Sequence, residues 1–121
     1  MLLNKMKLTF IGYPKCTTCK KAYKYLLDLG FDVTYRNIKE EQPTKEEILH
    51  WLDLGVSMDT MFNTSGALYR EYNVKEKRKT ATPEELVDLL ASDGMLVKRP
   101  IVLYKNQVLV GFKPEAYDLL K

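Results

Sequence analysis

The chain has 121 residues, of which 45% are hydrophobic, and a formal net charge of +3. This length predicts one domain, residues 1–121, with its own core, and so mild a charge does not by itself predict nucleic-acid binding. No apolar run approaches the roughly 20 residues of a membrane span, and residues 1–6 are too short for a signal peptide. We therefore expect a cytoplasmic protein without a membrane partner.

The first third of the chain predicts a β-α-β unit. Residues 7–11 form a strand that bends at Gly12, and an amphipathic helix follows over about 16–29, where Gly30 ends it. Residues 31–38 alternate as a half-buried strand that pairs in parallel with the first. The apolar side of the helix is expected to comprise Cys19, Ala22, Tyr23, Leu26 and Leu27.

The middle of the chain, about residues 44–92, predicts a helical insert. Thr44 and Thr82 each begin a helix with a capping box, since a glutamate follows three residues later. Ser57 caps a short helix, and the charged run 75–79 is interpreted as a solvated face, with an acidic partner or a phosphate backbone as the alternative. The first helix of the insert is expected to bury Ile48, Leu49 and Leu52.

The last part of the chain predicts a hairpin and a helix. Residues 101–104 and 107–111 are strands joined by a tight turn, and Pro114 begins a final helix that runs through Leu120. The element order β-α-β, helical insert, β-β-α predicts an α/β protein with a four-stranded mixed sheet.

Both cysteines lie where the first strand ends and the first helix begins. Cys16 and Cys19 are one helical turn apart and face the same side. The helix N-terminus stabilises a thiolate, and Lys15 and Lys20 add positive charge nearby. We therefore expect Cys16 to be a nucleophile and Cys19 a resolving thiol, with the backbone N–H groups of Thr17, Thr18 and Cys19 forming an anion site.

Two other interpretations of the cysteine pair stay open. Half of a zinc site would need further ligands, and His50 is the one other soft candidate in the sequence. A structural disulfide between residues this close would close a very short loop and stabilise little. We expect neither a metal nor a cofactor.

Two motifs carry a family resemblance that covers nearly the whole chain. The helix start Cys16–Ala22 and the segment Lys98–Ile101, together with the element order, resemble the ArsC/Spx family of thioredoxin-fold proteins, nearest to a group without a settled substrate. The resemblance implies a cis bond before Pro100, which would shape a substrate groove opposite Cys16, and it points Arg99 at an anion. An ordinary proline at a strand start is the alternative.

The same resemblance implies a function and its partners. Arsenate reductases of this family bind the oxyanion with three arginines; Arg99 matches one, whereas Asn63 and Lys113 stand near the other two positions. The implied activity is a thiol-dependent oxidoreductase that takes electrons from thioredoxin or from glutaredoxin and glutathione. The alternative is an Spx-type redox-sensing regulator that binds the RNA polymerase alpha C-terminal domain, without direct DNA reading.

Overall fold

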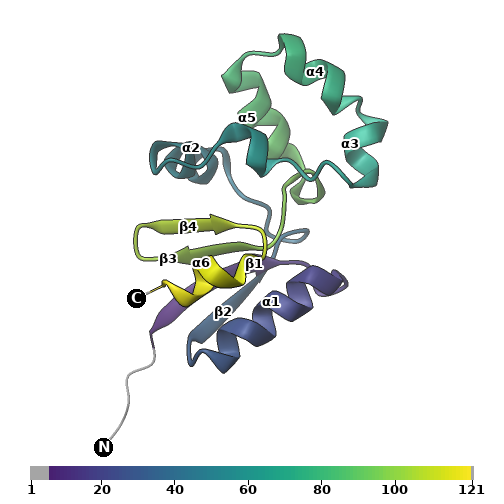
Figure 1. The fold of residues 1–121 in the computed structure, drawn as a ribbon. Helices are drawn as coiled ribbons and strands as arrows, with labels where there is room; N and C mark the ends of the chain where they lie inside the picture. Colours follow the sequence, from purple (N-terminus) through teal and green to yellow (C-terminus); the bar gives the residue numbers. More distant parts are fainter. Residues whose placement is uncertain (1–5, 121) are drawn as a thin grey trace, which may run out of the picture. The chain divides into compact units, whose positions relative to one another are not determined.

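The computed structural model describes residues 6–120, and the chain divides into two compact units (Figure 1). The first unit joins Met1–Asn37 to Arg99–Lys121 and contains both cysteines, and the second unit is Ile38–Lys98. That the two units form one domain stays a prediction. No helix within residues 6–120 is long and apolar enough to cross a membrane.

The first unit is built on a four-stranded sheet with the strand order β2-β1-β3-β4. β1 (Lys7–Gly12) pairs in parallel with β2 (Asp32–Asn37), whereas β3 (Ile101–Tyr104) runs antiparallel to both β1 and β4 (Gln107–Val110). Each strand begins and ends within one residue of its predicted bounds. The predicted thioredoxin-like α/β fold with a mixed four-stranded sheet is confirmed.

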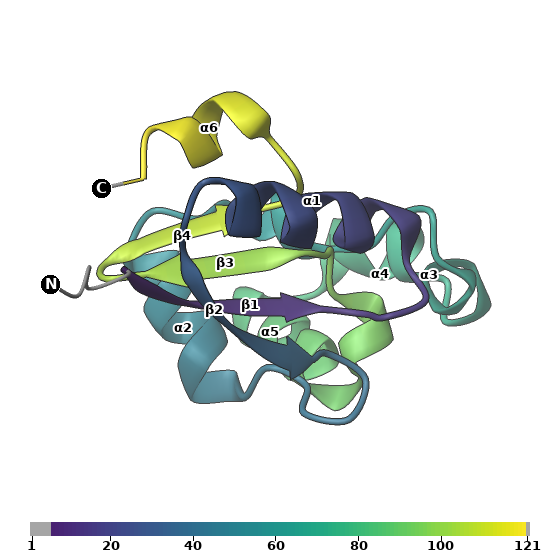
Figure 2. The ribbon, with the colours of Figure 1, turned by 90° about the horizontal axis from the view of Figure 1, so that it is seen from below.

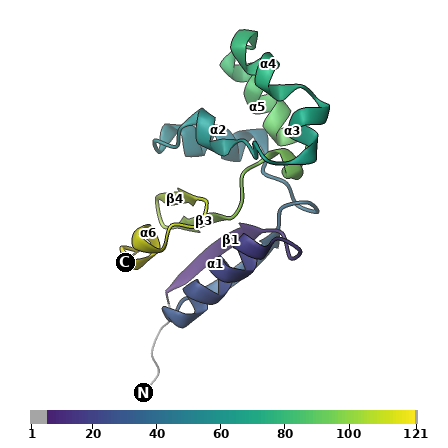
Figure 3. The same ribbon diagram turned by 45° about the vertical axis from the view of Figure 1, so that its right-hand side comes forward.

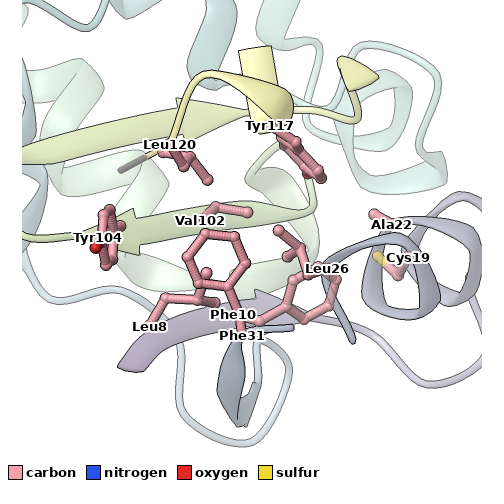
Figure 4. Close-up of a cluster of buried hydrophobic side chains, with 10 residues drawn as sticks. All are labelled: Leu8, Phe10, Cys19, Ala22, Leu26, Phe31, Val102, Tyr104, Tyr117 and Leu120. Carbon is pink, nitrogen blue, oxygen red and sulfur yellow. The ribbon is translucent and has the colours of Figure 1, made fainter. Parts of the chain in front are cut away.

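Two helices, α1 (Thr17–Asp28) and α6 (Pro114–Asp118), share a core with this sheet (Figures 2 and 3). Gly30 ends α1 as predicted, with a positive φ of 94° that favours glycine. Figure 4 shows the core, to which the two helices, strands β1 and β3, and the residues next to β2 and α6 contribute. Its buried residues are Leu8, Phe10, Cys19, Ala22, Leu26, Phe31, Val102, Tyr104, Tyr117 and Leu120.

Two predictions for these helices were wrong. Leu27 is 45% exposed, because the buried face of α1 follows the spacing of Cys19, Ala22 and Leu26 and leaves Leu27 on its flank. The final helix ends at Asp118 instead of continuing to residue 120, and Leu119 at its end is 72% exposed.

The second unit consists of short helices. These are α2 (Lys45–Asp53), η1 (Met58–Met61), α3 (Ala67–Glu71), α4 (Val74–Thr80), α5 (Pro83–Ser92) and η2 (Gly94–Leu96). Both predicted capping boxes are present, at Thr44 with Glu47 and at Thr82 with Glu85. The segment capped by Ser57 is a 3₁₀-helix. Leu49, expected to be buried, is 44% exposed because Ile48 and Trp51 supply the buried face of α2.

The charged run 75–79 belongs to a helix, α4. We expected the whole run to be solvated, but one of its residues is partly buried. Arg78 is half-buried, donates to the Tyr69 hydroxyl (3.0 Å) and pairs with Asp59. Its guanidinium also lies 4.9 Å from the centre of the Phe62 ring. Arg78 therefore ties η1, α3 and α4 together, whereas Lys75, Glu76, Lys77 and Lys79 are exposed.

Candidate functional site

The end of β1 and the start of α1 hold the two cysteines. Cys16 is the N-cap residue of α1, with extended backbone angles, and Cys19 lies in the first turn. The connecting residue Tyr13 holds both: its carbonyl accepts from the Cys16 N–H (2.9 Å), and its own N–H donates to the Cys19 sulfur (3.4 Å). Both cysteines are free thiols.

The two thiols have different surroundings, which shift their pKa values in opposite directions. Burial raises the pKa of the Cys16 thiol, but hydrogen bonds from the Cys19 backbone N–H, the Cys19 thiol and Arg99 outweigh it and lower this pKa below the ordinary 9.0. Cys19 is fully buried, and burial raises its pKa to about 12 against the opposing Tyr13 N–H. Cys16 is therefore the more readily ionised thiol and the more exposed one.

Arg99 lies beside the Cys16 sulfur. It precedes Pro100 through the cis bond that the resemblance implied, and the Pro100 carbonyl accepts from the Gly111 N–H (2.7 Å). The Arg99 guanidinium stacks 5.4 Å from the centre of the Tyr13 ring. Its Nε and Nη1 are buried and have no hydrogen-bond partner among residues 6–120, so they can donate to a bound anion.

The other predicted binding residues differ in their placement. Lys15, Thr17 and Thr18 are exposed next to Cys16, and Lys113 is exposed at the N-cap of α6, where its carbonyl accepts from Ala116 and Tyr117.

Asn63 belongs to the second unit, where its side-chain amide donates to the Met95 carbonyl (3.3 Å) and accepts from Ser65 (3.3 Å). Within the first unit the structure thus groups Cys16, Cys19 and Arg99. The roles of Asn63 and Lys113 in binding stay predictions.

Half of a zinc site was one interpretation of the cysteine pair. Among residues 6–120, no group of three or more His, Cys, Asp or Glu side chains could hold a metal ion.

Tyr13 is the residue of this site whose role the sequence reasoning missed. It contacts Cys16, Cys19 and Arg99 at once, two of them through its backbone and the third through its ring. An aromatic residue directly before the proline of the cysteine segment is a signal that could have singled it out. Its stacking on Arg99 makes it a positioning residue, because it holds the charge that lowers the pKa of Cys16.

Tyr13→Leu should slow the alkylation of Cys16 at neutral pH by roughly two- to fivefold, the size of a cation–π interaction of about 0.5–1 kcal/mol. The physical reason is that a displaced Arg99 stabilises the thiolate less. The measurement is the pH dependence of iodoacetamide modification at Cys16. Tyr13→Phe keeps the ring and should match the wild type; equal slowing in both variants would remove the stacking from the explanation.

Curated relatives cover nearly the same length as this chain. Over 114 residues it is 45% identical to the uncharacterised protein YusI of Bacillus subtilis (strain 168), covering 93% of this chain and 97% of YusI. The regulatory protein MgsR of the same organism is 29% identical over 118 residues (97% and 90%). The global transcriptional regulator Spx of Staphylococcus saprophyticus is 29% identical over 110 residues (89% and 82%).

Solved structures agree with this relationship. An ArsC family related protein from Bacteroides fragilis superposes with a TM-score of 0.91 at 46% identity, covering 98% of this chain and all of that one. A protein of Streptococcus mutans UA159 described as a possible arsenate reductase gives 0.81 at 40% identity, with 91% and 93% covered. The ArsC family model matches residues 11–120, which include both cysteines and the Arg99–Pro100 segment, so this chain belongs to the ArsC family.

Proposed function

We propose that the protein is a cytoplasmic thiol-dependent oxidoreductase in which Cys16 is the nucleophile and Cys19 the resolving thiol. The observation that carries this proposal is that the pKa values of the two thiols are shifted in opposite directions. Arg99 and Cys19 lower the pKa of Cys16, whereas burial raises the pKa of Cys19. A nucleophile whose pKa is lower than that of the neighbouring thiol ionises first, so it can attack a substrate before the internal pair closes.

The reaction proceeds by two exchanges at sulfur. The Cys16 thiolate attacks one sulfur of a substrate disulfide, a Cys16–substrate bond forms, and the other substrate sulfur leaves as a thiolate. Cys16 then no longer carries the charge that helps to raise the pKa of Cys19, so Cys19 loses its proton more easily. Cys19 attacks the Cys16 sulfur and releases the second substrate thiol, and the resulting disulfide is reduced by thioredoxin or by glutaredoxin and glutathione.

An oxidised oxyanion such as arsenate is the second substrate class that this site could accept. The unpartnered Nε and Nη1 of Arg99 and the N–H groups of Thr17 and Thr18 would hold the anion, with Lys15 adding charge. By the family resemblance, Asn63 and Lys113 stand near the positions where arsenate reductases have arginines, and neither side chain binds an oxyanion as an arginine does. Disulfides are therefore the substrate class that we favour.

A redox-sensing regulator is the alternative function. The similarity to MgsR and Spx, both named as regulators, supports it. In that case oxidation of Cys16 and Cys19 would change the binding of the RNA polymerase alpha C-terminal domain, and the same low pKa of Cys16 would make it the sensing thiol.

A coupled assay tests the enzymatic proposal. NADPH oxidation through thioredoxin reductase and thioredoxin is measured with a disulfide substrate, with arsenate and with neither, on the wild type and on Cys16→Ser. We expect oxidation that depends on the disulfide and is lost in the variant. Turnover that persists in Cys16→Ser would contradict the mechanism. Absence of all turnover, together with redox-dependent capture of the alpha C-terminal domain, would favour the regulator.

A further inference from the structure

Charge is distributed unevenly between the two parts of the chain. Residues 1–37 and 99–121 contain eleven Lys and Arg against four Asp and Glu, a net of +7, whereas residues 38–98 contain eight against twelve, a net of −4. Together these give the +3 of the whole chain. The thiols therefore belong to a strongly basic part of the protein, which attracts anionic partners.

The positive charge follows one face of α1 away from Cys16. The Lys20 N–H donates to the Cys16 carbonyl (3.1 Å), so Lys20 lies one helical turn beyond the nucleophile on the same side. Lys21 stands in the same relation to Thr17, and both lysines are exposed, as is Lys15 before the helix.

These three lysines have no carboxylate partner among residues 6–120. Lys24, one turn further along α1, pairs with Asp28 at 2.8 Å, but Lys15, Lys20 and Lys21 have no ion pair with any residue that the structure describes. Figure 2 shows α1 crossing in front of the strands of its unit. Cys19, Ala22 and Leu26 are the buried residues of α1 and belong to the core that the helix shares with the sheet. We call Lys15, Lys20 and Lys21 the lysine stripe.

An aromatic pair borders the stripe. Tyr23 on α1 and Tyr35 on β2 have ring centres 5.2 Å apart, and Tyr35 is 36% exposed. Tyr35 lies close to Gly12, the last residue of β1, after which the cysteine segment begins. A Cβ built on Gly12 would be 3.1 Å from the Tyr35 hydroxyl. Exposed tyrosine beside charge is typical of protein–protein interfaces, and rings packed against each other in this way leave no flat platform for nucleic-acid bases.

We infer that the lysine stripe docks an acidic protein that presents a disulfide to Cys16. The inference rests on the proposed function, because the stripe begins at the nucleophile and its partner must bring sulfur there. Carboxylates around the partner's disulfide would face lysines that lack carboxylates of their own, which speeds encounter and orients the sulfur.

The test uses three peptides that carry one cysteine as a 2-pyridyl disulfide, flanked by acidic, neutral or basic residues. The Cys16 thiolate attacks the peptide sulfur, a Cys16–peptide disulfide forms, and pyridine-2-thione leaves and is measured. At low ionic strength the wild type should react with the acidic peptide about tenfold or more faster than with the basic one, and this ratio should fall toward one at high salt.

A charge-reversed pair of variants locates the effect. Lys20→Glu with Lys21→Glu should abolish or reverse the acidic-to-basic ratio. Lys7→Glu with Lys105→Glu makes the same change in net charge near the β3–β4 turn and the start of β1, and should keep the ratio. Rates are compared with that of the neutral peptide in each variant, which corrects for any change in the reactivity of Cys16 itself.

The outcomes separate this inference from the function on which it rests. Equal ratios in the two double variants, or no dependence on peptide charge in the wild type, would overturn the docking surface while leaving Cys16 a nucleophile. Failure of even the neutral peptide to react would overturn the proposed function. Binding of a short DNA duplex that Lys20→Glu with Lys21→Glu removes, without any effect of peptide charge, would assign the stripe to nucleic acid instead.

Discussion

Cys16→Ser should abolish thiol exchange, with a loss of roughly 10³-fold or more, the scale on which removal of a nucleophile acts. A serine hydroxyl stays protonated where the Cys16 thiolate is favoured by Arg99 and by the Cys19 N–H. Cys19 cannot take over the attack, because it is fully buried, and this burial, which is the largest cause of its raised pKa, remains in the variant. The measurement is the release of pyridine-2-thione from the neutral peptide.

Cys19→Ser is the matched variant, since it removes one sulfur atom from the same helical turn. Here the first attack should persist while the resolution step fails, so a Cys16–peptide disulfide should accumulate and appear by intact mass. Faster alkylation of Cys19 than of Cys16 in the wild type at neutral pH would reverse the assignment of the two roles.

The pH dependence checks the same assignment. Because its pKa lies below 9.0, Cys16 should reach its full alkylation rate at a lower pH than an ordinary thiol does.

Cys19 makes the stability of the fold depend on pH. Its folded pKa of about 12 exceeds the ordinary 9.0, so its contribution to the free energy of unfolding is complete below pH 9 and is lost as the pH rises toward 12. Cys19→Ser should therefore lose less stability than the wild type over that range.

Gly94→Ala should lower the free energy of unfolding by about 3 kcal/mol or more, at the upper end of the cost of overpacking. Gly94 is buried at the start of η2, and a Cβ there would lie 1.8 Å from the Ile38 carbonyl oxygen and 2.8 Å from its carbon. Both are backbone atoms, so no side-chain rotation can relieve the overlap.

Urea unfolding of the whole chain measures this change. Lys75→Ala, at an exposed position of α4 in the same unit, is the control and should stay within about 0.5 kcal/mol of the wild type. A Gly94→Ala protein as stable as this control would mean that the backbone at Ile38 moves freely, contrary to the packing described above.

The sequence was sufficient where local chemistry determines structure. The sequence predicted two helix starts from the glutamates three residues after Thr44 and Thr82, and both capping boxes are present. It also predicted a helix end at Gly30, where the structure has a positive φ. The cysteine spacing and the arginine–proline pair pointed to Cys16, Cys19 and Arg99, which the structure groups in the first unit, and their roles in a reaction stay predictions.

The sequence failed where tertiary contacts decide. In α4 a single buried valine, Val74, anchors a helix whose other residues are mostly charged, so no apolar period was visible. Adjacent apolar residues such as Ile48 and Leu49 differ by about 100° around a helix, and only packing shows which one is buried. The role of Tyr13 was missed because its contact with Arg99 joins residues distant in sequence.

The hydrogen bonds of Asn63 bear on how relatives of this protein diverged. Its amide donates to the Met95 carbonyl and accepts from Ser65, and a Cβ at Gly66 would lie 2.7 Å from its nitrogen. An arginine has no acceptor for the serine hydroxyl and a longer side chain. We therefore expect positions 63, 65 and 66 to covary among homologues, so that lineages are better separated by the whole Asn63–Gly66 segment than by the presence of one arginine.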